Sequence, residues 1–146
     1  MNEEDSKAIT LSLLKNVYRS FDFREEEDVY DKLAISVSGD LLTDIYLQSR
    51  KSMQIEQAGG AEAKVKQLEV LQTQVQDSAK QNGALDVRTK WTAIGSVGHW
   101  GHIHTRQNLY DAILTLAVVD SSWKITGLTI LEEKRIDPTS REPSTQ

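Results

Sequence analysis

Residues 85–97, LDVRTKWTAIGSV, alternate apolar and polar side chains along most of their length. Because successive side chains of a strand point to opposite faces, this period of two predicts a long, half-buried β-strand. Three further strands are expected nearby, over residues 65–75, 103–119 and 123–135. Turn residues separate them at 81–83 and 120–122. The second part of the chain therefore predicts an antiparallel meander.

The first part of the chain has a helical period instead. Apolar residues recur every three or four positions after Ser6, which predicts a helix that ends at residues 21–24. Four acidic residues at 25–28 begin a second helix, where the helix dipole favours carboxylates. Gly39 ends that helix, and Asp40 can cap a third. The break at residues 57–60 separates helices from strands.

Length, charge and composition limit the number of domains and the kinds of partner. The chain has 146 residues, 22 acidic and 17 basic, with a net charge of −5 and no cysteine. We expect one domain over residues 6–136 and a disordered tail over residues 137–146, which holds both prolines. The scattered basic residues argue against nucleic acid as a partner, and no apolar run is long enough for a membrane span.

The predicted fold is α+β, with three N-terminal helices packed on a curved, mostly antiparallel four-stranded sheet. The element order, together with YRSFDFR at residues 18–24 and VGHWGHIH at residues 97–104, resembles the nuclear-transport-factor-2-like superfamily. That superfamily includes ketosteroid isomerase and SnoaL-type cyclases, and the two stretches are similar to bacterial domains of unassigned function within it. The resemblance covers residues 6–136 and implies a cone-shaped, cystatin-like roll with a conical pocket.

The pairing of the second and third strands can be predicted from their faces. A two-residue turn at His99-Trp100 would set Gly95 opposite His104 and Ala93 opposite Arg106. The same pairing keeps one apolar face continuous across both strands, through Leu85, Val87, Trp91, Ala112, Leu114 and Leu116. A slip of one residue would break this agreement, because it would turn every side chain to the other face.

A polar row extends this core face toward the hairpin tip. Its neighbours on the second strand are small, which leaves space for a pocket with an apolar floor and a polar rim. The candidate ligand-binding residues are Tyr18, Trp91, His102, His104, Arg106, Asn108 and Tyr110.

Two chemical roles compete with plain ligand binding. A zinc site would need three or four protein ligands, and His99 is expected at the hairpin tip, apart from His102 and His104. We therefore expect these histidines to form local hydrogen bonds, with no metal or cofactor. Acid–base chemistry could use His104, Tyr110 and Asp22. The acidic run that follows Asp22 is a weaker candidate for a cation site.

The sequence thus predicts a non-catalytic module that binds a small apolar or amphipathic ligand, or a protein. The alternative is a small acid–base enzyme of the isomerase, dehydratase or cyclase type, and a third interpretation is an accessory domain of a membrane-linked protein. Apolar residues on both faces of the third strand predict a homodimer that pairs through the sheet. The compartment stays open: the acidic start favours the cytoplasm, and an excised domain of a larger protein would also suit the periplasm.

Overall fold

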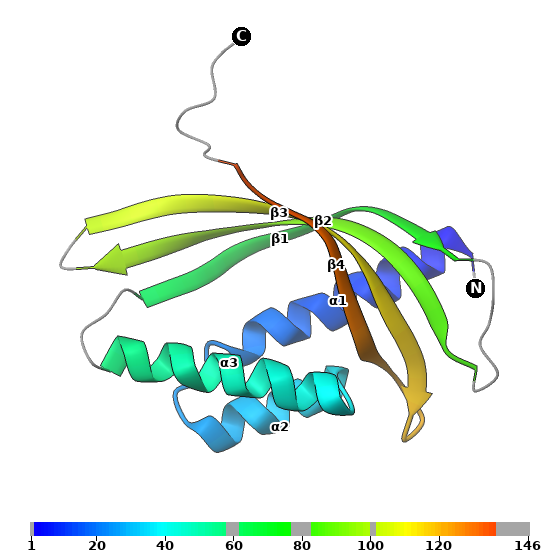
Figure 1. Ribbon diagram of the computed structural model, residues 1–146, viewed down its shortest axis with the longest axis horizontal. Coiled ribbons are helices and arrows are strands. Elements are labelled where there is room, and N and C mark those ends of the chain that lie inside the picture. The colour runs from blue at the N-terminus through cyan, green and yellow to red at the C-terminus, as the bar shows by residue number, and fades with distance from the viewer. Residues whose placement is uncertain (1, 58–61, 77–82, 100–101, 137–146) are drawn as a thin grey trace, which may run out of the picture.

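A computed structural model describes residues 2–57, 62–76, 83–99 and 102–136. Three helices precede four strands: α1 (Glu3–Ser20), α2 (Glu26–Ser36), α3 (Asp40–Gln57), β1 (Glu62–Val75), β2 (Leu85–His99), β3 (His102–Val119) and β4 (Ser122–Ile136). The strands form one sheet in the order β1-β2-β3-β4, and each neighbouring pair is antiparallel (Figure 1). The predicted α+β fold is confirmed.

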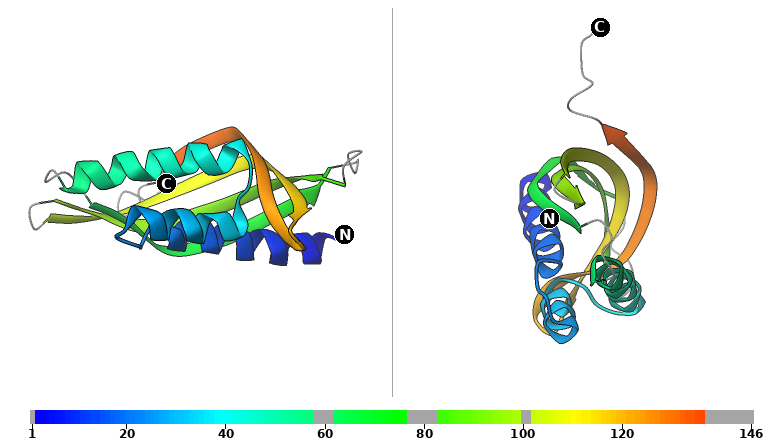
Figure 2. Two further views of the ribbon diagram at one scale, coloured as in Figure 1. Left: turned by 90° about the horizontal axis from the view of Figure 1, so that it is seen from below. Right: turned by 90° about the vertical axis from the view of Figure 1, so that its left-hand side faces the viewer.

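The three helices lie on one side of the sheet, which curls around the space that α1 and α3 flank (Figure 2). Where the helices pack against the sheet, apolar side chains from both layers form the core. Its fully buried members are Val29, Leu33, Val37, Val87, Ala112, Leu114 and Leu116. The layers are therefore held together by burial of the apolar faces that the sequence pattern marks.

Two helix boundaries differ from the prediction. The first helix begins at Glu3, because the side chain of Asn2 accepts a hydrogen bond from the backbone N–H of Asp5 at 2.7 Å. Ser6 is instead buried inside α1, and its hydroxyl lies 3.1 Å from that of Thr73 in β1. At the end of α2, Val37 leaves the helix and forms an isolated parallel bridge with Ile125.

The register of the central hairpin differs from the prediction by two residues. Gly95 pairs with Arg106, Ala93 with Asn108, and Trp91 with Tyr110. A shift of two residues leaves every side chain on its predicted face, so the expected core face is right. His99 lies at the hairpin end of β2, where it forms the last pair of the ladder with His102. The expectation that His99 stands apart from His102 is therefore wrong.

The turn predicted at residues 120–122 is confirmed. Asp120 and Ser121 have φ values of 52° and 69°, and Val119 pairs with Ser122. Positive φ at both central residues is typical of the type I′ turns that match the twist of a hairpin. The turn residues 81 and 82 and the predicted disordered tail, 137–146, lie outside the described residues.

The outer face of the sheet is only partly apolar. Ile113, Ala117 and Val119 are half-buried there. Beside them, the guanidinium of Arg88 donates to both carboxylate oxygens of Asp111, at 3.1 and 2.7 Å. The Arg88 guanidinium lowers the pKa of this carboxyl. The homodimer through this face stays a prediction.

Of the helices described, none combines the length and apolarity of a membrane span.

Candidate functional site: a cavity between α1, α3 and the sheet

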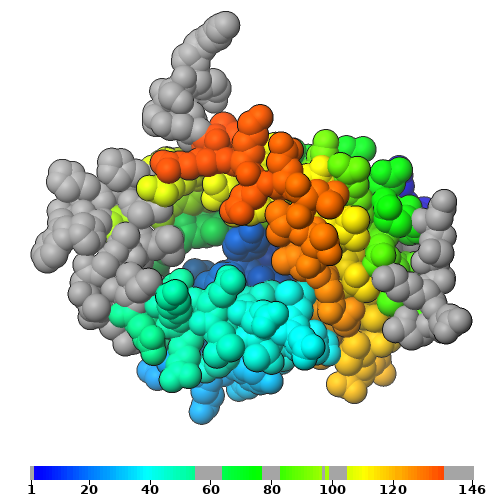
Figure 3. Space-filling model, viewed as in Figure 1, coloured from blue at the N-terminus to red at the C-terminus, as the bar shows by residue number. Residues whose placement is uncertain are grey.

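One cavity of about 550 Å³ lies between the C-terminal end of α1, helix α3 and the hairpin end of the sheet. Its opening is visible in Figure 3 as a hollow above α3, with α1 behind it. The lining residues are Tyr18, Phe21, Asp22, Ile45, Gln48, Ser49, Ser52, Met53, Lys64, Val65, Ala93, Gly95, Ser96, Arg106, Asn108 and Tyr110. This volume is within the range of small-molecule sites.

Small residues on β2 leave room for the cavity. Arg106 and Asn108 of β3 lie directly opposite Gly95 and Ala93 of β2. Directly opposed residues of an antiparallel pair share a face, so the long polar side chains extend over positions with almost no side chain. The close approach of β1 also requires a glycine at position 95, because an added Cβ would clash with the carbonyl oxygen of Lys64.

An aromatic cluster borders the cavity. The indole N–H of Trp91 donates to the hydroxyl of Tyr18 at 3.1 Å. The Trp91 ring stacks on that of Tyr110, with centroids 5.2 Å apart and planes at 25°. Trp91 is only 4% exposed. Trp91 therefore packs behind the two tyrosines, and the tyrosines themselves line the cavity.

Burial changes the acidity of both tyrosines. Loss of hydration raises the pKa of Tyr110 to about 12, and negative charge on Tyr18 and Glu133 acts in the same direction. The side chains of Asn108 and Glu133 act on this pKa in opposite directions, since Asn108 lowers it and Glu133 raises it. Burial also raises the pKa of Tyr18, against the hydrogen bond from Trp91. At neutral pH, both phenols are protonated and can serve as hydrogen-bond donors.

Tyr110→Phe should remove the highest-pH component of the tyrosinate absorbance. The folded state holds the Tyr110 proton up to a pKa of about 12, above the ordinary value of 10.0. The folded state thus binds more protons than the unfolded state between these values, so its stability falls as pH rises through them. Tyr30→Phe is the matched control, and it should keep the component near pH 12. Loss of that component in the control, or its survival in Tyr110→Phe, would contradict the assignment.

Arg106 is the cation on the inner wall. Its Nε atom is buried and has no hydrogen-bond partner within the described ranges. The described residues form ion pairs between Arg50 and Glu26 and between Arg88 and Asp111, and neither involves Arg106. Asp22 and Lys64 also line the cavity, and both residues are exposed.

The structure brings together most, and not all, of the candidate residues. Tyr18, Asp22, Arg106, Asn108 and Tyr110 line one cavity. Trp91 lies behind it. The backbone of β3 is described at His102 and His104, but their side chains lie outside the described part of the structure. The metal, acid–base and ligand-binding roles considered for these histidines stay predictions.

The α3 wall and the β4 residues were missed from sequence. On α3 the lining residues are Ile45, Gln48, Ser49, Ser52 and Met53. Three- and four-residue spacing places these polar side chains on one helical stripe, but in a sequence such a stripe is also typical of a solvent-facing helix. On β4, Glu133 pairs with Tyr110 and Arg135 with Asn108. Only the pairing of β4 with β3 shows that these two charged residues lie beside Tyr110 and Asn108.

The acidic run at the start of α2 borders a different depression, of about 560 Å³. Its lining includes Arg24, Tyr46, Met53 and residues 25–28. All four of these acidic residues are exposed. Exposed carboxylates at a helix start are already accounted for by hydration and the helix dipole. We therefore place the candidate site in the cavity under the sheet.

Comparison with known proteins supports the fold alone. No family model and no curated protein matches the chain. The structure is similar to the crystal structure of the intermembrane space region of chloroplast protein ARC6, with a TM-score of 0.57, 16% identity, and coverage of 90% of this chain and 97% of that chain. A solution structure of a de novo designed β-sheet protein matches with a TM-score of 0.49, 16% identity and 95% coverage of each chain. The resemblance to the nuclear-transport-factor-2-like superfamily stays a prediction.

Proposed function

We propose that this domain is a non-catalytic binding module, and that its ligand is a small amphipathic molecule held in the cavity between α1, α3 and the sheet. The observation that supports the proposal is the mixture of apolar and polar side chains in the cavity lining. Apolar side chains of Ile45, Met53 and Val65 share one cavity with the polar groups of Arg106, Asn108 and Tyr110. An apolar enclosure with a few convergent polar groups is typical of ligand sites.

The lining supports binding more strongly than acid–base catalysis. A general base must lose its proton near working pH, and the raised pKa of Tyr110 keeps its phenol protonated there. Asp22 lies at an exposed position of the cavity lining, in contact with solvent. The small acid–base enzyme therefore stays the alternative, and it depends on His104.

A neutral fluorescent dye tests the proposal without assuming a ligand charge. N-phenyl-1-naphthylamine should bind the wild-type protein at one site, with increased fluorescence. Ala93→Phe adds a ring to the sheet wall, where Ala93 is 5% exposed, so it should weaken dye binding roughly tenfold or more. The matched control is Ile94→Phe, one position along β2 and on the other face. It should leave dye binding unchanged.

Equal dye affinity in wild type and Ala93→Phe would contradict the proposal, provided that circular dichroism shows the variant folded. So would an equal loss of affinity in Ile94→Phe, because the dye would then be sensing overall stability instead of the cavity.

A further inference from the structure

The positive charges at the hairpin end of the cavity suggest which kind of ligand it takes. Arg106 and Asn108 are two positions apart on β3, so they share a face of the sheet. Arg135 of β4 lies directly opposite Asn108 and therefore shares that face too. Two guanidinium groups thus flank one amide along the inner face.

Two negative groups, Glu133 and Asp22, lie nearby, and neither forms a salt bridge with Arg106 among the described residues. Glu133 lies on β4 directly opposite Tyr110. Asp22 follows α1 at an exposed position. Lys64 adds a second cation to the lining. The local balance around Arg106 is positive, although the whole chain has a net charge of −5.

The buried Nε of Arg106 is a second reason to expect a negatively charged ligand in this cavity. A buried N–H without a partner is costly, and native structures seldom leave one unpaired. An anionic group in the cavity would accept that hydrogen bond and neutralise the charge. A guanidinium binds a carboxylate with better geometry than an ammonium does, because its N–H groups form a planar fork.

We propose that the cavity selects amphipathic organic carboxylates, with the carboxylate bound by Arg106 and Asn108 and assisted by Arg135. The inference rests on the proposed function, since it names the ligand class of the same cavity. The apolar body of the ligand would lie along Ile45, Met53 and Val65. Tyr110 would border the head group as a neutral phenol and would not repel it.

Titration calorimetry with decanoate and decanol, both below their micellar concentrations, separates charge from apolar contact. Wild-type protein should bind decanoate about 10-fold or more tighter than decanol. Arg106→Gln should weaken decanoate binding about 10- to 100-fold and leave decanol binding nearly unchanged, since only the charge-assisted hydrogen bond is lost. Arg135→Gln should give a smaller loss for decanoate, because this side chain is exposed.

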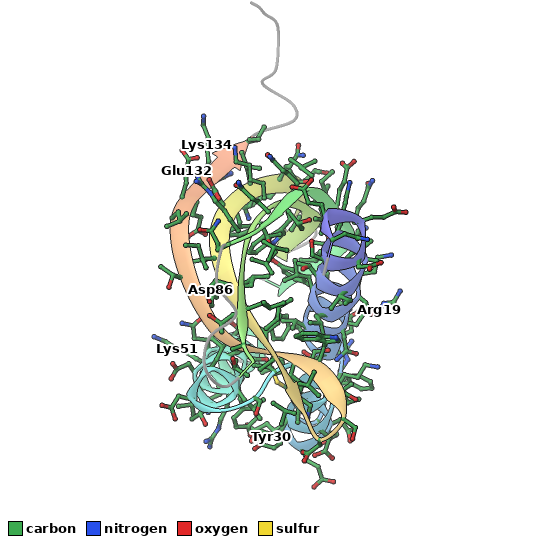
Figure 4. All side chains as sticks on the ribbon, turned by 90° about the vertical axis from the view of Figure 1, so that its right-hand side faces the viewer. Arg19, Tyr30, Lys51, Asp86, Glu132 and Lys134 are labelled. Carbon is green, nitrogen blue, oxygen red and sulfur yellow. The ribbon has the colours of Figure 1, made fainter. Side chains whose placement is uncertain are left out.

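Lys134→Gln is the matched control for charge. Lys134 neighbours Arg135 and points outward from β4 (Figure 4), so its loss changes net charge equally without touching the cavity. It should leave decanoate binding unchanged. Thermal melting of each variant checks that it folds.

Tighter binding of decanoate that depends on Arg106 and not on Lys134 supports the inference. Equal affinities for decanoate and decanol, or decanoate binding unaffected by Arg106→Gln, would overturn the inference and leave the binding module intact. If neither compound nor the neutral dye binds, the proposed function itself fails.

Discussion

Leu114→Ala is expected to lower the free energy of unfolding by about 3 to 4 kcal/mol. Leu114 lies in the middle of β3 and is 1% exposed, inside the core that joins the sheet to the helices. Truncation there removes buried apolar area and leaves a cavity that neighbouring β-strands can fill only in part. Urea denaturation monitored by circular dichroism measures the change.

Val118→Ala on the same strand is the control for Leu114→Ala. Val118 is 59% exposed, so its truncation should cost less than about 0.5 kcal/mol. Similar losses for the two variants would contradict the burial of Leu114 in the core.

Gly95→Ala is expected to destabilise the fold by about 2 to 3 kcal/mol and to weaken binding in the cavity. The added Cβ would clash with the Lys64 carbonyl and lie 3.1 Å from the Val65 Cα. Both contacts are with the backbone of β1, which can relieve them only by moving away from β2. Since Gly95 and Val65 also line the cavity, its wall would be displaced.

Gly127→Ala tests whether this loss is specific to position 95. A Cβ at Gly127 would meet only the side chain of Thr115, at 3.1 and 3.2 Å, and a side chain can shift by a few tenths of an ångström. Its unfolding midpoint should therefore fall much less than that of Gly95→Ala. Equal midpoints in the two variants would mean that β1 does not approach β2 closely at Gly95.

The alternation of apolar residues was enough to predict the strands and their buried face. It could not predict the hairpin register, because sliding one strand by two residues preserves every face. The position of the connection between β2 and β3 decides between the two registers, and the glycines at 95, 98 and 101 allow more than one position for it. The shift moved Arg106 from Ala93 to Gly95, the position with no side chain at all.

Cavity residues on α1 and β3 could be predicted, whereas those on α3, and the β4 charges paired with Tyr110 and Asn108, could not. Tyr18 and Arg106 lie on elements whose inner faces are marked by apolar periodicity. The stripe of Gln48, Ser49 and Ser52 on α3 looks like solvent-facing helix in a sequence. It lines a cavity only because α3 and α1 flank the curled sheet, which is a property of tertiary packing (Figure 2). Glu133 likewise reaches Tyr110 through cross-strand pairing.

Amide chemical-shift mapping locates the bound ligand on the molecule. When labelled protein is titrated with N-phenyl-1-naphthylamine, we expect the largest shifts at cavity positions on three elements: Ser49, Ser52, Gly95, Asn108 and Tyr110. Residues 25–28 at the start of α2 and Arg88 on the outer face should change little. The largest shifts at those outer positions, or none at the cavity, would contradict the account.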